Sequence, residues 1–137
     1  MKKLIALFAA IIISLSSFAQ QEVKDMEPKV NYGSLGLERI ENGKQMILTA
    51  TKEQLLANPK LIPDIPGSVI KSYTISFFPK GADIKGPYKI KGAELSAETK
   101  KIITESNVLT KIFIENIIVT YKDVDLKSKP IAIQFEK

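Results

Sequence analysis

The segment SVIKSYTISFF, residues 68–78, decides the fold class of this chain. From Tyr73 to Phe77 every second side chain is large and apolar, which is the period expected of a strand buried on one face. The same alternation returns in PIAIQFE, residues 130–136. Both runs predict β-strands, and together they bound a cassette, residues 68–137, that we expect to hold the core of the domain.

A third apolar run, KIFIENIIVTY, covers residues 111–121, and its alternation slips near Glu115 and Asn116. Apolar side chains therefore occur at both odd and even positions of the run. Two explanations fit this slip: a central strand covered on both faces, or a bulge that re-aims the chain. We favour the central strand, because a helix expected just before it needs a sheet face to cover.

That helix is predicted between Ser96, a good N-cap residue, and Ser106, with Glu98 in its positive first turn. Before it, YKIKG (residues 88–92) alternates apolar and lysine side chains, which predicts a short strand with one solvated face. Residues 122–129 are polar and predict a hairpin connection between the last two strands.

The region ahead of the cassette gives weaker signals. Asn42-Gly43 predicts a tight turn that joins two short strands. Thr51 and Gln54 form a capping box, which predicts a helix of about two turns. Residues 60–67 are rich in proline, and we expect an extended connector that takes no part in a sheet.

The N-terminus has the pattern of a cleaved export signal. Lys2 and Lys3 precede an apolar run, residues 4–15, and small residues follow, with Ala19 at the expected cleavage point. An uncleaved anchor is the alternative, but the run is shorter than the roughly 18 apolar residues that a membrane span needs. The sequence contains no cysteine, so it lacks the attachment point of a lipoprotein. We expect a protein of the periplasm or the extracellular medium that spans no membrane after cleavage.

Composition indicates a single folded domain. The chain has 137 residues, of which 45% are hydrophobic and 26% charged, as in ordinary globular proteins. We expect a signal peptide over 1–19, a flexible lead over 20–29 and one domain over 30–137. Of the 20 basic residues, Lys2 and Lys3 would leave with the signal, and 18 would remain against 15 acidic ones. This excess is too small to indicate nucleic-acid binding.

The residue types argue against catalysis. Histidine and cysteine are both absent, which excludes zinc sites built on them, thiol nucleophiles and Ser-His-acid triads. We therefore predict no enzyme activity, no catalytic residues and no cofactor. Asp123 and Asp125 have the spacing that can begin a calcium site, but calcium takes six to eight oxygen ligands. A solvated turn is the favoured interpretation, and a small-ligand or cation site at this loop is the alternative function.

Four lysines on the predicted loop and short strand are the candidates for contact with a partner. They could bind an acidic protein surface or the phosphates of the outer-membrane envelope. They could also serve only to protect the edge of a sheet from aggregation, which is the interpretation we favour. These residues are Lys80, Lys85, Lys89 and Lys91.

The order of these elements also resembles a known family. SYTISFF, a loop bounded by glycines, YKIKGAELSAETKKII, KIFIENIIVTY and PIAIQFE together resemble the C-terminal β domains of GldM. GldM is the periplasmic component of the Bacteroidota gliding-motility and type IX secretion motor. The similarity covers roughly residues 68–137, and a signal peptide that ends in FAQ is in the style of the same phylum.

The resemblance implies an immunoglobulin-like antiparallel β-sandwich with one or two short helices, used for protein contact and without catalytic residues. GldM proteins begin with a membrane helix and a long helical stalk, and this sequence shows neither pattern. We therefore expect a free-standing, secreted relative of the GldM tail domain. Its expected function is that of a non-catalytic interaction or structural module, and its expected partner is another protein of the cell envelope.

Overall fold

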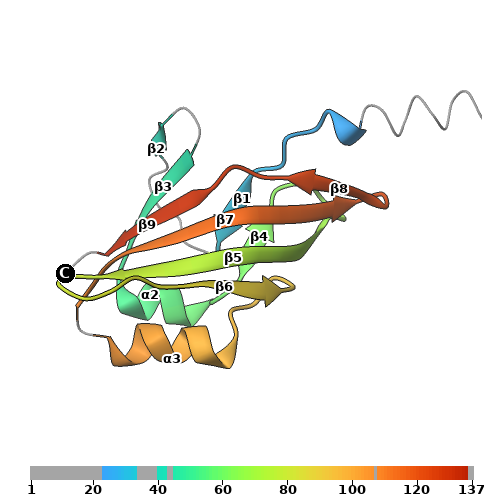
Figure 1. Ribbon diagram of the computed structural model, residues 1–137. Coiled ribbons are helices and arrows are strands. Elements are labelled where there is room, and N and C mark those ends of the chain that lie inside the picture. The colour runs from blue at the N-terminus through green and yellow to red at the C-terminus, as the bar shows by residue number, and fades with distance from the viewer. Residues whose placement is uncertain (1–22, 34–39, 43–44, 107, 136–137) are drawn as a thin grey trace, which may run out of the picture.

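The computed structural model describes residues 23–33, 40–42, 45–106 and 108–135. They form one large sheet, one two-stranded sheet and two helices (Figure 1). The described chain is mainly β, which confirms the prediction from the alternating runs. Across the large sheet the strands are β2 (Ile40–Asn42), β3 (Gln45–Ala50), β9 (Ile131–Phe135), β7 (Leu109–Tyr121), β5 (Val69–Pro79) and β6 (Lys85–Lys91).

The long strand β7 is the centre of this sheet. It pairs with β5 on one side, and on the other side it pairs first with β9 and then with β8 (Val124–Lys127). The predicted polar hairpin connection over 122–129 is not only a connection, because residues 124–127 form β8 and pair with β7. Lys122 and Asp123 have φ values of 49° and 61°, which suits the two-residue turn of a tight hairpin.

A bulge at Asn116 explains the slip in the β7 sequence. Thr74 lies opposite Glu115 and Ser72 lies opposite Ile118, so β7 has one extra residue at this point. Asn116 has a φ of 52°, in the left-handed region. The central strand covered on both faces, which we favoured, is therefore not the explanation. The extra residue keeps the fully buried side chains of β7 on a single face; these are Ile112, Ile114, Ile117 and Val119.

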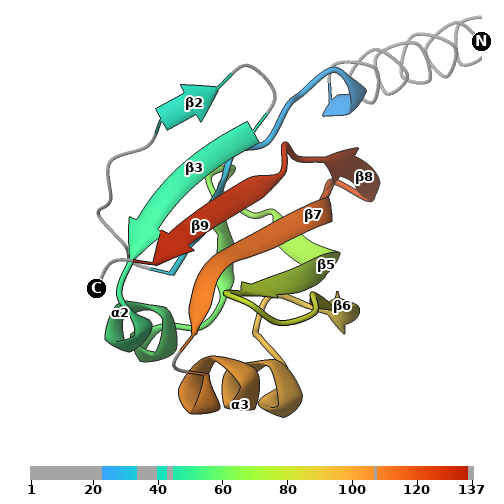
Figure 2. The same cartoon turned by 60° about the vertical axis from the view of Figure 1, so that its left-hand side comes forward.

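A second layer covers this buried face. It contains two helices, α2 (Lys52–Ala57) and α3 (Ala97–Glu105), and a small antiparallel sheet of β1 (Val30–Tyr32) and β4 (Leu61–Pro63). Figure 2 shows the helices below the large sheet, and Figure 1 shows β1 and β4 behind it. Residues of all four elements join one hydrophobic core with the large sheet. Strand β4 lies in the segment that we predicted to be an unpaired connector; its proline, Pro63, is tolerated because it ends a short edge strand.

The sequence signals for both helices are confirmed. Thr51 accepts a hydrogen bond from the Gln54 N–H, and the Gln54 side chain accepts one from the Thr51 N–H, so α2 has the predicted capping box. Ser96 caps α3 through the Thr99 N–H. The predicted hairpin also forms, since β2 and β3 pair antiparallel with Asn42 opposite Gln45. Gly43 of that turn lies outside the described residues.

The arrangement of the strands differs from the predicted sandwich in one respect. β3 and β9 run parallel, with Leu48 opposite Ile133, so the prediction of an antiparallel fold is wrong for this pair. An immunoglobulin-like sandwich is not confirmed, because the layer that faces the large sheet holds two helices as well as the β1–β4 sheet. None of the described helices has the length and apolar character of a membrane span.

Candidate interaction surface

Strand β6 forms one edge of the large sheet. Within the described residues it pairs with β5 alone. Ile90 is buried and Tyr88 is half-buried, whereas the other five residues of β6 are exposed. An exposed edge strand presents unpaired backbone groups, which makes it a natural place for another chain to bind.

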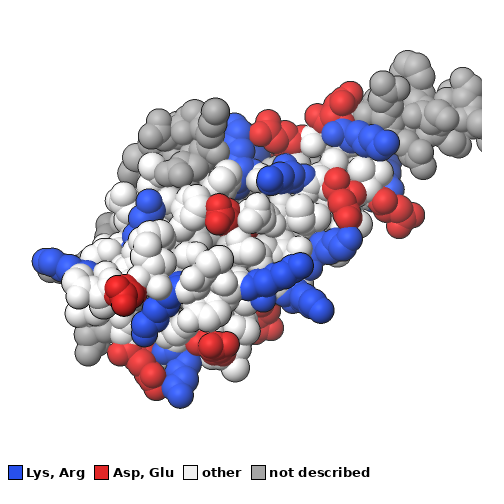
Figure 3. Space-filling model, in the orientation of Figure 1, with Lys and Arg blue, Asp and Glu red and all other residues white. Residues whose placement is uncertain are grey.

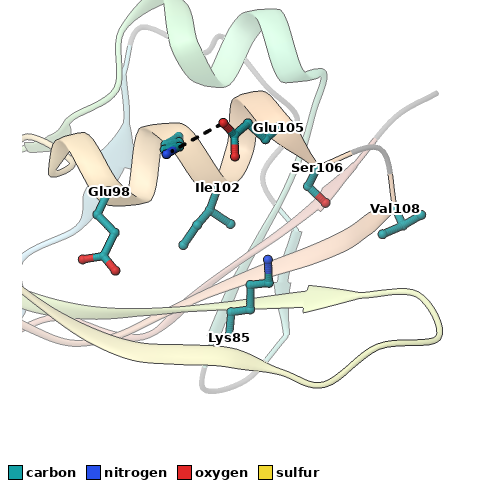
Figure 4. A pocket seen from close by; sticks show the side chains of 7 residues that line it. Lys85, Glu98, Ile102, Glu105, Ser106 and Val108 are labelled. Carbon is teal, nitrogen blue, oxygen red and sulfur yellow. Dashed lines mark ion pairs between the residues drawn. The ribbon is translucent and has the colours of Figure 1, made fainter.

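The predicted contact lysines lie at this edge but do not share one face. Lys89 and Lys91 lie opposite Thr74 and Ser72, on the face of the sheet that the second layer does not cover. Lys85 lies opposite the buried Phe77, and Figure 4 shows its side chain directed toward α3. Lysine on both faces of one strand follows from a register shift between Tyr88 and Lys85, where β6 has one residue more than β5.

Lys80, the fourth predicted residue, follows β5 directly. Its N–H donates to the Val108 carbonyl at 2.7 Å, which joins the start of the β5–β6 loop to the segment before β7. Lys80 is exposed. Within the described part of the chain, none of the four lysines forms an ion pair with another residue.

A groove of about 540 Å³ lies between α3 and the β5–β6 hairpin (Figure 4). Ile102 of α3 and Val108 supply its apolar lining, and the Val108 side chain is 51% exposed. Charged residues surround this lining, and Lys101 and Glu105 lie 4.0 Å apart across one turn of α3. The remaining lining residues are Lys85, Glu98 and Ser106.

Sequence reasoning did not find this groove. Its residues come from β6, from α3 and from the segment between α3 and β7, and no sequence pattern places them together. A sequence feature that could have indicated the groove is Val108, a β-branched residue that lies between the end of a predicted helix and the start of a strand. Two such apolar residues, Ile84 at 58% and Val108 at 51%, are among the exposed large hydrophobic residues of the described chain.

The uncovered face of the large sheet carries mixed chemistry. Phe78 and Phe113 are half-buried there, and Lys111 lies over both rings, with its Nζ at 5.8 and 5.7 Å from their centroids. On the same face, β5 carries small side chains with hydroxyl groups. Figure 3 shows lysines spread over this side of the molecule, with acidic residues between them in places. The surface is therefore basic in places.

The Asp123 and Asp125 pair does not form a cluster of carboxylates. Asp125 accepts hydrogen bonds from Lys71 Nζ at 2.7 Å and from Thr120 Oγ1 at 2.8 Å. These two donors, Lys71 first, hold the pKa of Asp125 below its usual value. Asp123 lies in the tight turn and is exposed. No group of three or more potential metal-binding side chains occurs among the described residues.

Two buried tyrosines connect the layers behind this surface. Tyr32 of β1 donates from its hydroxyl to the Leu55 carbonyl of α2 at 2.8 Å, and Tyr73 of β5 donates to the Ala93 carbonyl at 3.2 Å. Burial raises the pKa of both phenols. Neither residue lines the groove described above.

No protein-family model matches this chain, and no curated protein matches it.

Proposed function

We propose that this protein is an exported, non-catalytic interaction module that binds an acidic protein of the cell envelope through the β6 edge. The observation that carries the proposal is the position of Lys89 and Lys91 on an edge strand that pairs with β5 alone among the described strands. Exposed charges of one sign steer a partner of the opposite sign and set the specificity of its binding.

Two sequence patterns support the envelope location. The first 19 residues have the pattern of a cleaved signal peptide, and the order of the later elements resembles the tail domain of GldM. A link to gliding motility or type IX secretion and an immunoglobulin-like ancestry are part of this proposal. Support for them comes from the order of strand, lysine-bearing strand, capped helix and closing strands. We do not extend the proposal to cation binding, because the Asp125 carboxylate is already engaged by Lys71 and Thr120.

Crosslinking in the native envelope fraction tests this function. One variant reverses the charge of Lys80, Lys89 and Lys91 by substitution with Glu. We expect it to lose the partner that the wild-type protein recovers repeatedly. A matched control reverses three exposed lysines elsewhere, Lys24, Lys122 and Lys127, and should keep the partner.

Two results would contradict the proposal. One is the absence of any recurrent partner while the protein stays monomeric under all conditions. The other is equal loss of the partner in both triple variants, which would show a general effect of net charge. Because exposed charges are screened over about 8 Å at physiological ionic strength, recovery should also fall as salt is raised.

A further inference from the structure

The backbone of β6 has a definite outward side. The Gly92 N–H donates to the Lys71 carbonyl at 2.8 Å, toward β5. In an antiparallel pair, alternate residues direct their N–H and C=O groups to the same neighbour. Ile90 and Tyr88 therefore bond toward β5 in the same way as Gly92, whereas Lys89 and Lys91 direct their backbone groups away from the sheet.

The two flanks of this edge differ in chemistry. On the covered side, the groove between α3 and the hairpin offers Ile102 and the half-exposed Val108. On the uncovered side, the side chains of Lys89 and Lys91 are exposed. A strand added to the edge would place alternate side chains on these two flanks, because successive residues of a strand point to opposite faces.

We propose that β6 accepts an extended segment of the partner as an added strand, and that this segment alternates apolar and acidic residues. This inference rests on the proposed function and states the form of the contact. The apolar side chains would enter the groove beside Val108, and the acidic ones would meet Lys89 and Lys91. A second copy of the chain fits poorly, because pairing β6 with itself would bring lysines of like charge together.

The test uses the protein purified after expression of the full chain and a labelled peptide, acetyl-Val-Glu-Val-Glu-Val-Glu-Val-amide. At saturating peptide we expect hydrogen exchange of the Lys89 and Lys91 amides to slow by about tenfold or more, since a new strand would bond them. A peptide with Lys in place of Glu should bind at least about tenfold more weakly because its charges are repelled.

Two pairs of matched changes separate strand addition from simple charge attraction. Lys89→Pro removes the outward N–H and should reduce peptide affinity by about tenfold or more, whereas Lys89→Thr keeps this N–H, removes the charged side chain and should cost about two- to fivefold. The same peptide N-methylated at alternate amides should also lose affinity. This second loss does not depend on how the Lys89→Pro variant folds.

A third pair tests the groove. Val108→Asp places a charge in the groove and should lower the affinity of the peptide. Val69→Asp makes the same change at an exposed valine away from the groove and should leave the affinity unchanged. Equal binding of the methylated and unmethylated peptides, or unchanged exchange at Lys89 and Lys91, would overturn the proposal. If the envelope partner still crosslinks and depends on the β6 lysines, the proposed function stands and strand addition alone fails.

Discussion

The two faces of the large sheet use the same strands for different purposes. On the covered face of β7, Ile112 and Ile114 are fully buried against the second layer. On the opposite face of the same strand, Phe113 and Ile118 are half-buried and have polar neighbours. The comparison shows that stability and surface chemistry are separated by face, so that changes on the uncovered side should leave the fold nearly intact.

The largest expected effect comes from truncating the covered face. Ile114→Ala should lower the free energy of unfolding by about 2–5 kcal/mol, because it leaves a cavity in the shared core. Ile118→Ala, the same change on the half-buried face, should cost about 1 kcal/mol, since only part of that side chain is removed from water. Urea denaturation measures both, and equal losses would contradict the division between the faces.

The bulge that keeps these faces apart gives the next effect. Asn116→Val places a β-branched residue at a positive φ and should cost about 1–3 kcal/mol. Asn116→Gly tolerates the same backbone and should stay within about 0.5 kcal/mol of the wild type. If denaturation shows that valine is accepted as well as glycine, the bulge does not set the register of β7.

The covering layer supplies a third test. The Leu55 carbonyl would bond to residue 59 in a longer helix, but Pro59 has no N–H, and the Tyr32 hydroxyl takes that place. Tyr32→Phe should therefore cost about 1–3 kcal/mol by leaving a buried acceptor unpaired.

Tyr73→Phe is the matched control in thermal or urea unfolding. The Ala93 carbonyl keeps the Leu61 N–H as a partner at 2.9 Å, so the loss should be smaller. A larger loss for Tyr73→Phe would contradict this assignment of roles.

The smallest effect lies on the β7–β8 hairpin and depends on pH. Hydrogen bonds from Lys71 and Thr120 lower the pKa of Asp125 in the folded state. The ionised Asp125 side chain therefore stabilises the fold at a pH above the ordinary aspartate pKa, and this stabilisation is lost as the pH falls through the lowered pKa. Asp125→Asn should be slightly less stable at neutral pH and equal to the wild type in acid. A difference that grows on acidification would contradict the sign of this shift.

Local signals in the sequence predicted local structure well. The capping box at Thr51 and the cap at Ser96 identified both helices, and the alternation from Tyr73 to Phe77 identified β5. The pairing of β3 with β9 was not accessible in this way, because parallel partners are set by contacts between residues more than 80 positions apart in the chain. The sequence shows that the alternation slips at Asn116. The cause of the slip, a bulge, is revealed only by the register in which β7 pairs with β5.

Only part of the candidate surface was predicted, because the rest depends on contacts between distant segments of the chain. The four lysines were found from the alternation of residues 88–92 and from their exposed loop, and all four are exposed at or beside the β6 edge. Their division between two faces was not predicted, because it follows from one additional residue between Lys85 and Tyr88. The groove depends on Val108 and Ile102, which meet only when α3 packs beside the hairpin.

The position of β9 has a consequence for the order of assembly. Residues 131–135 bridge β3 and β7, yet they follow every other strand of the sheet in the chain. During synthesis β3 can form its hairpin with β2 and β7 can pair with β5, but these two halves cannot join before β9 has emerged. The nascent chain therefore carries two unpaired strand edges until β9 is made, and a chaperone that shields them would act in that interval.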